Sequence, residues 1–322
     1  MCSYIINTKL KEFFMFEKKI SLEDKDLFEK YIYNNNHETS GLSFASLYMW
    51  KDINDIHYEI INNHLCIRAL NYLTEEGKPQ HFIFPPLPVG EYDSDTFNDT
   101  LKILEKNFKK DNQNLTIKLA PEKYINYFKE TNNSNVLIKE DRENFDYAYL
   151  SDNLATLKGR KYQSKRNHLN YFYRNYSFEY RPLTKDLMEE CIHLNDSLIE
   201  NKTFENDMAE ELMSHERKAI EEALYNMDTL GCRGGAILIN DKVEAFTLGY
   251  KINPDMMVVH IEKANPSIRG LYQAINQQFV QNECTDVTYI NREEDMGLES
   301  LRRAKLSYRP DKMIKKFDIE FK

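Results

Sequence analysis

The chain has 322 residues, of which 41% are hydrophobic and 30% are charged, and its formal net charge is −9. This composition is typical of a globular protein with a buried core, which excludes a disordered, low-complexity or fibrous chain, and the length suits two domains or one large one. The negative net charge also argues against indiscriminate nucleic-acid binding.

The first residues, MCSYIINTKLKEFFMF, carry Lys9, Lys11 and Glu12 where a signal peptide would need an apolar core. No apolar run approaches the roughly 18 residues of a membrane-spanning helix. The five cysteines are scattered without a C-x-x-C pair, which favours reduced thiols over a disulfide framework or a zinc site. The sequence therefore predicts a cytoplasmic protein without a metal centre or transmembrane segment, and it leaves open whether Met1 or Met15 is the start.

The first half alternates strand-like and helix-like segments. A strand pattern over 15–21 precedes helical patterns over 25–33 and 43–53. Asn62 and Asn63 then separate two alternating segments, as in a hairpin whose turn needs positive φ. The remaining predicted elements are a strand at 81–87, a helix at 96–110, a strand at 115–120, a helix at 122–128 and further strands up to Tyr149.

Residues 157–175, LKGRKYQSKRNHLNYFYRN, form a basic and aromatic segment in this acidic chain. Apolar residues near helical spacing predict a basic linker helix over 151–175, capped by Ser151 or Asp152. Such a charge run is either a solvated face or a cradle for a polyanion, in which cations neutralise phosphates and aromatic rings stack on bases. The cations that would serve in a cradle are Lys158, Arg160, Lys161, Lys165 and Arg166.

The second half repeats the same order of elements. Its predicted elements are a strand at 178–184, helices at 185–202 and 206–227, a hairpin turning at Asn240-Asp241, a strand at 255–264, a helix at 267–281, a strand at 286–291, a helix at 298–308 and a last strand at 313–321. Runs of strands beside β–α crossovers indicate mixed sheets flanked by helices, an α/β (α+β) fold. Because the two halves share this order, we predict related domains at 15–150 and 151–322.

This element order resembles the GNAT acyltransferase fold in tandem. Four stretches sharpen the likeness: YLSDNLATLKGRKYQSKRNHLNYF, HIEKANPSIRGLYQAINQQF, INREEDMGLESLRRAKLSYRP and FIFPPL. Together they resemble the bacterial family grouped with the C-terminal catalytic domain of phosphatidylglycerol lysyltransferases, which is related to the Fem peptidyltransferases. Active members of that group move an aminoacyl group from charged tRNA to an acceptor amine or hydroxyl.

The resemblance therefore implies an acyl or aminoacyl transferase with aminoacyl-tRNA as the donor substrate and a small molecule or peptide as the acceptor. Two alternatives stay open: an acyl-CoA-dependent N-acyltransferase, and a non-catalytic tRNA- or RNA-binding protein on a transferase fold. The donor, the acceptor and the oligomeric state are not fixed by the sequence.

In a GNAT fold the fourth strand parts from the fifth, and the next helix points its first backbone N–H groups into the gap, where they suit a pyrophosphate. The fold's motif at that helix start is Gln/Arg-x-x-Gly-x-Gly/Ala, and Gly270 matches it here, while Tyr272 replaces the small residue and would crowd coenzyme A. The donor-binding residues predicted beside the basic segment are Arg269, Gly270, Tyr272 and Arg292. The corresponding place in the first half, 85–90, contains three prolines, which donate no amide hydrogen, so a degenerate donor site is expected there.

Polar side chains mark the two strands that border the predicted gap. Strand alternation puts His260 and Glu262 on one face of the fourth strand. On the fifth strand it places on one shared face Tyr289, Asn291 and Glu293. Arg292 then points to the opposite face.

Acyl transfer to an amine requires a base for the amine proton and donors that hold the developing oxyanion. We expect Glu262 or Glu293 to be the base, directly or through water. The expected oxyanion donors are Asn291, Arg292 or a free backbone N–H near Ile261. The resemblance adds Tyr308, which follows the last helix where GNAT enzymes often place a tyrosine that protonates the leaving group. The plain alternatives are a half-buried, hydrogen-bonded His260 and a Tyr308 that only seals its helix against the sheet.

Overall fold

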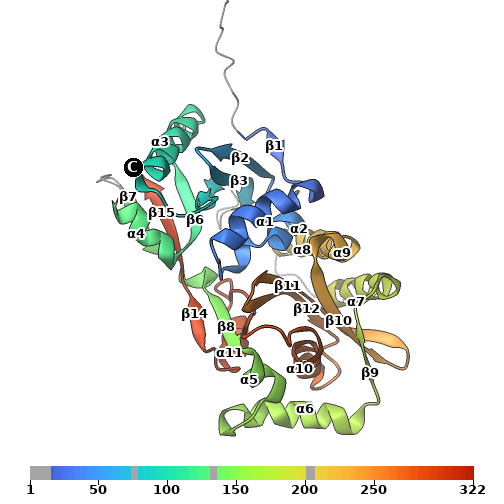
Figure 1. Ribbon diagram of the computed structural model, residues 1–322. Helices are drawn as coiled ribbons and strands as arrows, with labels where there is room; N and C mark the ends of the chain where they lie inside the picture. Colours follow the sequence, from blue (N-terminus) through green and yellow to red (C-terminus); the bar gives the residue numbers. More distant parts are fainter. Residues whose placement is uncertain (1–15, 74–78, 131–135, 201–206) are drawn as a thin grey trace, which may run out of the picture.

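The computed structural model describes residues 16–73, 79–130, 136–200 and 207–322, so the predicted alternative start at Met15 lies outside the described residues. The described residues form two mixed β-sheets, one above the other in Figure 1, with helices packed on and between them. This confirms the predicted α/β (α+β) fold. Within the described part of the chain, every helix is too short or too polar to cross a bilayer.

The first sheet is assembled around the β2–β3 hairpin, whose turn residues Asn62 and Asn63 have φ of 47° and 60°, as the sequence predicted. Its strands in spatial order are β1 (Lys18–Lys19), β2 (Ile56–Ile61), β3 (His64–Leu73), β4 (Pro79–Ile83), β6 (Thr116–Pro121), β15 (Lys316–Phe321) and β7 (Val136–Glu140), and β5 (Leu87–Pro88) pairs with β3. The helices of this half are α1 (Lys25–Asn34), α2 (Phe44–Met49), α3 (Ser94–Lys110) and α4 (Glu122–Glu130).

The second sheet is built around the β10–β11 hairpin, which turns at Asn240 and Asp241 with φ of 52° and 61°. Its strands in spatial order are β14 (Lys312–Ile314), β8 (Asp146–Leu150), β13 (Tyr289–Asn291), β12 (Met256–Ala264), β11 (Lys242–Asn253), β10 (Cys232–Ile239) and β9 (Glu179–Pro182). The helices of this half are α5 (Ser151–Thr156), α6 (Gln163–Asn175), α7 (Met188–Glu200), α8 (Asp207–Tyr225), α9 (Met227–Leu230), α10 (Leu271–Glu283) and α11 (Glu299–Leu306).

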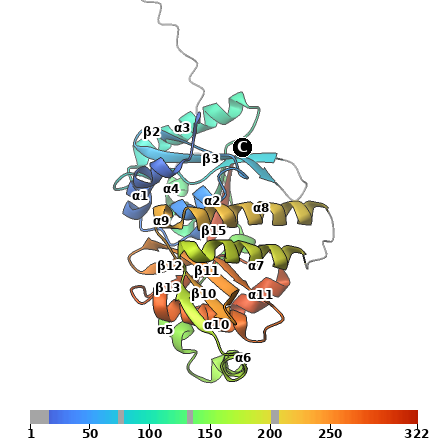
Figure 2. The ribbon, with the colours of Figure 1, turned by 90° about the vertical axis from the view of Figure 1, so that its right-hand side faces the viewer.

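Apolar side chains of β12 point alternately to the two faces of this sheet, so that a helix packs on each face. Met257 and Val259 pack into the core formed with α10, whereas Val258 points to the other face, toward Ala45 of α2. A fully buried side chain of this size stabilises the fold by about 1.5–3 kcal/mol relative to leaving it exposed. The short helix α2 therefore sits between the two sheets and touches both (Figure 2).

The two sheets exchange their last strands. The chain leaves β7 in the first sheet and enters β8 in the second, and it leaves β14 in the second sheet and enters β15 in the first. The last strand predicted at 313–321 is therefore two strands, and a boundary at residue 150 does not separate the sheets.

A buried ion pair lies where the exchanged strands cross. Lys316 Nζ is 2.6 Å from Asp146 Oδ1, and their side chains are 1% and 0% exposed. Asp146 also accepts hydrogen bonds from the backbone N–H of Ser40 (2.8 Å), from Ser40 Oγ (2.9 Å) and from Asn291 Nδ2 (3.0 Å). The carboxylate is thus surrounded by donors from both halves of the chain.

The basic linker helix predicted over 151–175 is interrupted. The backbone has positive φ at Leu157 (49°) and Gly159 (91°), which separates α5 from α6. Leu157 tolerates this angle because its side chain is buried in the core of the second sheet. The helix α6 then lies at the end of the molecule remote from the first sheet (Figure 1).

Candidate active site

The gap between β12 and β13 is the central feature of the candidate site. These parallel strands pair only where Met256–Val258 lies beside Tyr289–Asn291. Beyond that point β12 continues to Ala264 without β13 at its side. Backbone groups on this edge of β12 are therefore not used in a ladder with β13. The predicted parting of the fourth and fifth strands is confirmed.

A β-bulge in β12 lies at the start of the gap. Val259 pairs with Gly249 of β11, and Ile261 pairs with the preceding Leu248, so that His260 is the extra residue. A bulge leaves one residue out of the ladder and bends the strand. It supplies the kind of free backbone group that was expected near Ile261.

The bulge also changes which face each side chain occupies. His260 contacts Ser43 of α2, whereas Glu262 contacts Asn276 of α10. The prediction that His260 and Glu262 share a face is therefore wrong, because strict alternation fails at a bulge. The site consists of two clusters on opposite faces of the sheet.

On the α10 face, Glu262 is held by two partners. Arg292 Nη2 donates to Glu262 Oε1 at 2.7 Å, and Asn276 Nδ2 donates to Glu262 Oε2 at 3.0 Å. The side chains of Glu262 and Arg292 are only 13% and 15% exposed. Both carboxylate oxygens are occupied, which leaves Glu262 poorly placed to accept a substrate proton.

Tyr308 lies beneath two cations in the same cluster. Arg292 Cζ is 4.8 Å and Lys165 Nζ is 4.1 Å from the centre of its ring. Burial raises the pKa of Tyr308 to about 12, so the hydroxyl is protonated at neutral pH. Burial and the nearby Arg292 lower the pKa of Lys165 to about 8. An anion bound here would relieve the repulsion between the two cations.

On the opposite face, Glu293 is linked to the first half of the chain through His260. His260 Nδ1 lies 2.7 Å from Glu293 Oε1, and His260 Nε2 lies 3.0 Å from Ser43 Oγ. The His260 side chain is 2% exposed, whereas that of Glu293 is 27% exposed. Within the described residues the second oxygen of Glu293 has no hydrogen-bond partner.

Asn291 occupies this face as predicted, but its amide is fully used. Its Nδ2 donates to the backbone oxygen of Glu38 (2.9 Å) and to Asp146 (3.0 Å), and its Oδ1 accepts from the backbone N–H of Glu293. Asn291 has no hydrogen left for an oxyanion, so its predicted catalytic role is not supported. It shapes the turn that presents Glu293.

The start of α10 is packed against protein. Gly270 has a φ of 90°, and a Cβ there would overlap the backbone oxygen of His168 in α6. Glycine is therefore needed for helix-to-helix contact, and a role for Gly270 in donor binding is not supported. Arg269 lies 4.5 Å from the ring centre of Tyr171, and Tyr272 is 39% exposed.

The five cations predicted to serve in a cradle divide into two groups. Arg166 donates to backbone oxygens of Leu157 and Gly159, so it holds the loop before α6. The other cations have no carboxylate partner among the described residues, and these are Lys158, Arg160, Lys161 and Lys165. The first three are exposed and Lys165 is half-buried. The segment thus offers exposed positive charge, and Lys165 brings part of it next to Arg292.

In the first half, the corresponding gap is filled by the chain itself. β4 and β6 pair only at Ile83 and Ile117. A Cβ on Gly41 would lie 3.5 Å from Leu119 and 3.9 Å from Phe84, so this segment already occupies the space. The arrangement agrees with the predicted degenerate donor site, which stays a prediction.

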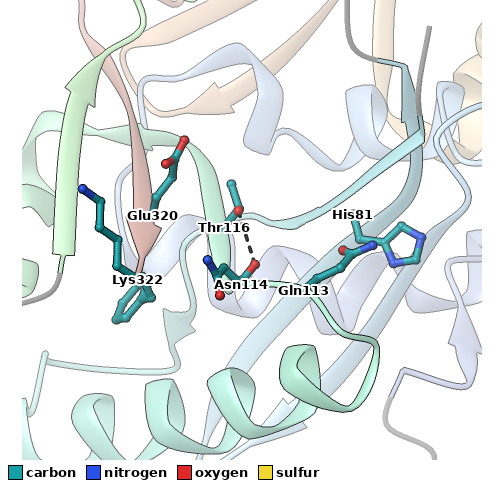
Figure 3. A pocket seen from close by; sticks show the side chains of 7 residues that line it. His81, Gln113, Asn114, Thr116, Glu320 and Lys322 are labelled. Carbon is teal, nitrogen blue, oxygen red and sulfur yellow. Dashed lines mark hydrogen bonds between the residues drawn. The ribbon is translucent and has the colours of Figure 1, made fainter. Parts of the chain in front are cut away.

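A cavity of about 320 Å³ lies elsewhere, at the end of β15 in the first sheet (Figure 3). Its polar walls include His81, Gln113, Asn114, Thr116, Glu320 and Lys322. It contains none of the predicted site residues, so we do not assign the chemistry to it.

Several residues of the site could not be predicted from the sequence, because no local pattern marks them. Ser43 lies 217 positions from His260, and Asn276 is one polar residue among many on α10. Lys305 of α11 donates to the backbone oxygens of Arg292 and Glu293 and fixes the same turn. Only the tertiary fold brings them together.

Known proteins share this architecture. Residues 34–320 match the family described as phosphatidylglycerol lysyltransferase, C-terminal. A crystal structure of a conserved protein of unknown function from Bacteroides thetaiotaomicron is 34% identical, with a TM-score of 0.85 over 96% of this chain and 100% of that chain. An uncharacterised protein of Mycoplasmoides gallisepticum is 27% identical over 185 residues, which are 57% of this chain and 58% of the relative.

More distant structures share the fold. L-PGS from Bacillus licheniformis has a TM-score of 0.63 at 12% identity, over 94% of this chain and 93% of that chain. FemX has a TM-score of 0.61 at 8% identity, over 93% of this chain and 96% of that chain. The predicted resemblance to these two groups is confirmed, together with the tandem GNAT-like fold.

Proposed function

Because the chain belongs to the family of phosphatidylglycerol lysyltransferase C-terminal domains, we propose that it is an acyltransferase that moves an aminoacyl group from charged tRNA to an acceptor amine or hydroxyl. In this reaction the acceptor attacks the ester carbonyl carbon, the bond from that carbon to the ribose oxygen breaks, and the ribose oxygen takes a proton. The protein must accept one proton, hold the oxyanion and bind the tRNA end.

The observation that carries the proposal is the free oxygen of Glu293. One carboxylate oxygen is fixed by His260 and the other is unpartnered at a partly exposed side chain, as a general base requires. Both oxygens of Glu262 are occupied by Arg292 and Asn276. We therefore assign the base to Glu293, and we assign to Glu262 the task of orienting Arg292.

The remaining roles follow from charge and position. The backbone freed by the bulge at His260 and the Arg292 guanidinium are the oxyanion donors that the gap offers. Tyr308, protonated at neutral pH, stays the predicted donor to the ribose oxygen. The unpaired cations of the basic segment and the Arg269–Tyr171 stack suit the phosphates and bases of a single-stranded tRNA end.

A transfer assay tests this assignment. The chain is mixed with tRNA carrying radiolabelled amino acids and with simple amines such as glycinamide, and label in the amide product is counted. Glu293→Gln is expected to lower the rate by about 10²–10⁴-fold, the usual contribution of a general base. Glu262→Gln, the comparison variant on the other face, keeps an oxygen that can accept from Arg292 and is expected to lower the rate less than about tenfold. Equal losses in both variants would refute Glu293 as the base.

The acyl-CoA alternative is separable by binding. In a GNAT enzyme the pyrophosphate lies at the start of the helix that corresponds to α10. Here α6 packs against Gly270, and the bulky Tyr272 replaces the small residue of the motif. A ligand at 100 times its Kd should stabilise the fold by about 2.7 kcal/mol. No shift in Tm with millimolar acetyl-CoA is expected, and a clear shift would favour the acyl-CoA alternative. Salt-sensitive tRNA binding without any transfer product would favour the non-catalytic one.

A further inference from the structure

Ser43 of the first half completes a chain of hydrogen-bonding groups that ends at Glu293. Ser43 Oγ lies 3.0 Å from His260 Nε2, and His260 Nδ1 lies 2.7 Å from Glu293 Oε1. Ser43 is completely buried, and the His260 side chain is nearly so. The three groups come from the start of α2, the bulge of β12 and the turn after β13.

The direction of these hydrogen bonds follows from their fixed members. The backbone N–H of Ser46 donates to Ser43 Oγ at 2.9 Å, which leaves the hydroxyl hydrogen available for donation to His260 Nε2, 3.0 Å away. At the other end an ionised Glu293 only accepts, so His260 Nδ1 must carry the hydrogen. Both partners select the same neutral form of the ring.

We infer that Ser43 is a positioning residue for the proposed reaction: it holds the neutral His260 ring with Nδ1–H toward Glu293, so that the second Glu293 oxygen is presented to the acceptor. This inference rests on the proposed function for its role in the reaction. Ser43 does not act as a nucleophile, because its hydroxyl is buried and already bonded on both sides.

The anchor is rigid because α2 is wedged between the sheets. Ala45, two residues after Ser43, packs against Ala148 and Val258 of the second sheet. Phe44 and Leu47 pack into the core of the first sheet. Glu293, the proposed general base at the second sheet, is therefore positioned by a helix of the first half. The site is complete only when the two halves of the chain are assembled.

Three variants distinguish the contact of the Ser43 hydroxyl with His260 from its role as the cap of α2. Ser43→Gly removes the hydroxyl, and glycine is an acceptable residue at a helix N-cap. Ser43→Thr keeps a hydroxyl at the same place and serves as the rescue. Ser46→Ala changes the next serine of α2 and keeps the backbone N–H that Ser43 accepts, so it is the matched control.

The first readout is the position of the proton on His260, measured by ¹⁵N NMR of ring-labelled histidine at pH 8. The His260 signal is assigned by its loss in His260→Gln. We expect the proton on Nδ1 in the wild type and in all three serine variants, because Glu293 requires it there, and a changed Nε2 signal in Ser43→Gly alone, where the hydrogen bond to Nε2 is lost. A wild-type ring protonated on Nε2, or an unchanged spectrum in Ser43→Gly, would overturn the inference.

The second readout is the rate of transfer. Ser43→Gly is expected to lower kcat at least tenfold with KM unchanged, and Ser43→Thr is expected to restore most of it. Acyl label found covalently on Ser43 by mass spectrometry would make it a nucleophile and overturn the positioning role. If the wild type transfers nothing, the proposed function fails, while the NMR result still decides whether Ser43 sets the ring.

Discussion

Lys316→Met tests how much the buried ion pair at the strand crossing contributes to stability. The variant keeps the apolar stem of the side chain but leaves the Asp146 carboxylate buried without its cation. Removing one partner of a buried pair costs about 3–5 kcal/mol. Three hydrogen bonds from Ser40 and Asn291 remain on Asp146, so we expect a loss near the lower end, about 3 kcal/mol. Urea unfolding followed by circular dichroism measures it as a lower midpoint.

The neighbouring Lys315→Met is the matched control. Lys315 is 40% exposed and pairs with the exposed Glu140 at 3.3 Å, so its loss should cost less than about 1 kcal/mol. In the double variant Lys316→Met/Asp146→Asn neither charge remains, and we expect at least half of the stability to return. The ion pair does not have the role described if Lys316→Met costs no more stability than Lys315→Met. The same holds if the losses of Lys316→Met and Asp146→Asn, measured singly, simply add in the double variant.

The pair also sets a direction for the acid dependence of stability. Burial alone would raise the pKa of Asp146, but Lys316 and the hydrogen bonds hold it below its usual value. A lowered carboxyl pKa contributes stability that is present above the unfolded pKa and is lost as the pH falls through the folded pKa. Without Lys316 the pKa of Asp146 rises, so Lys316→Met loses less stability on acidification through this group, and the stability difference between the wild type and the variant should shrink as the pH falls.

Three further outcomes are expected. Gly270→Ala should lower Tm by several degrees, because positive φ costs about 1–2 kcal/mol and a Cβ overlaps the His168 carbonyl; an unchanged Tm would contradict this packing. Binding of uncharged tRNA, measured by fluorescence anisotropy, should weaken from pH 7 to pH 9 as Lys165, with its pKa of about 8, loses its proton, and Lys165→Met should abolish that pH dependence. By contrast, Lys158→Met should weaken binding at every pH and reduce the salt slope by about 1; a slope that stays the same would place Lys158 away from the RNA.

Much of the second half could be predicted because its signals are local. Turn residues with positive φ, such as Asn240 and Asp241, mark the hairpin, and apolar spacing marks α10. The parting of β12 from β13 was implied by the resemblance to the GNAT fold, whereas the hairpin and the helix needed only local patterns. These features depend on residues close together in the chain, where the sequence pattern and the structure report the same physical constraint.

The misses have a common cause in tertiary structure. The bulge at His260 has no local marker, since the strand is apolar on both sides of it and only pairing with β11 reveals the extra residue. The break before α6 falls partly on Leu157, which adopts a positive φ because the core holds its side chain. Ser43 reads as an ordinary helix cap, and its contact with His260 appears only when the two halves pack.

The exchanged strands have a consequence for how the protein is made. β15 fills the place between β6 and β7, yet its residues are synthesised roughly two hundred positions after β6, and such distant pairing is slow. Until β15 has left the ribosome, the edges of β6 and β7 that it will cover stay open and can pair with other chains. This topology therefore favours chaperone binding to the nascent first half until β15 is added.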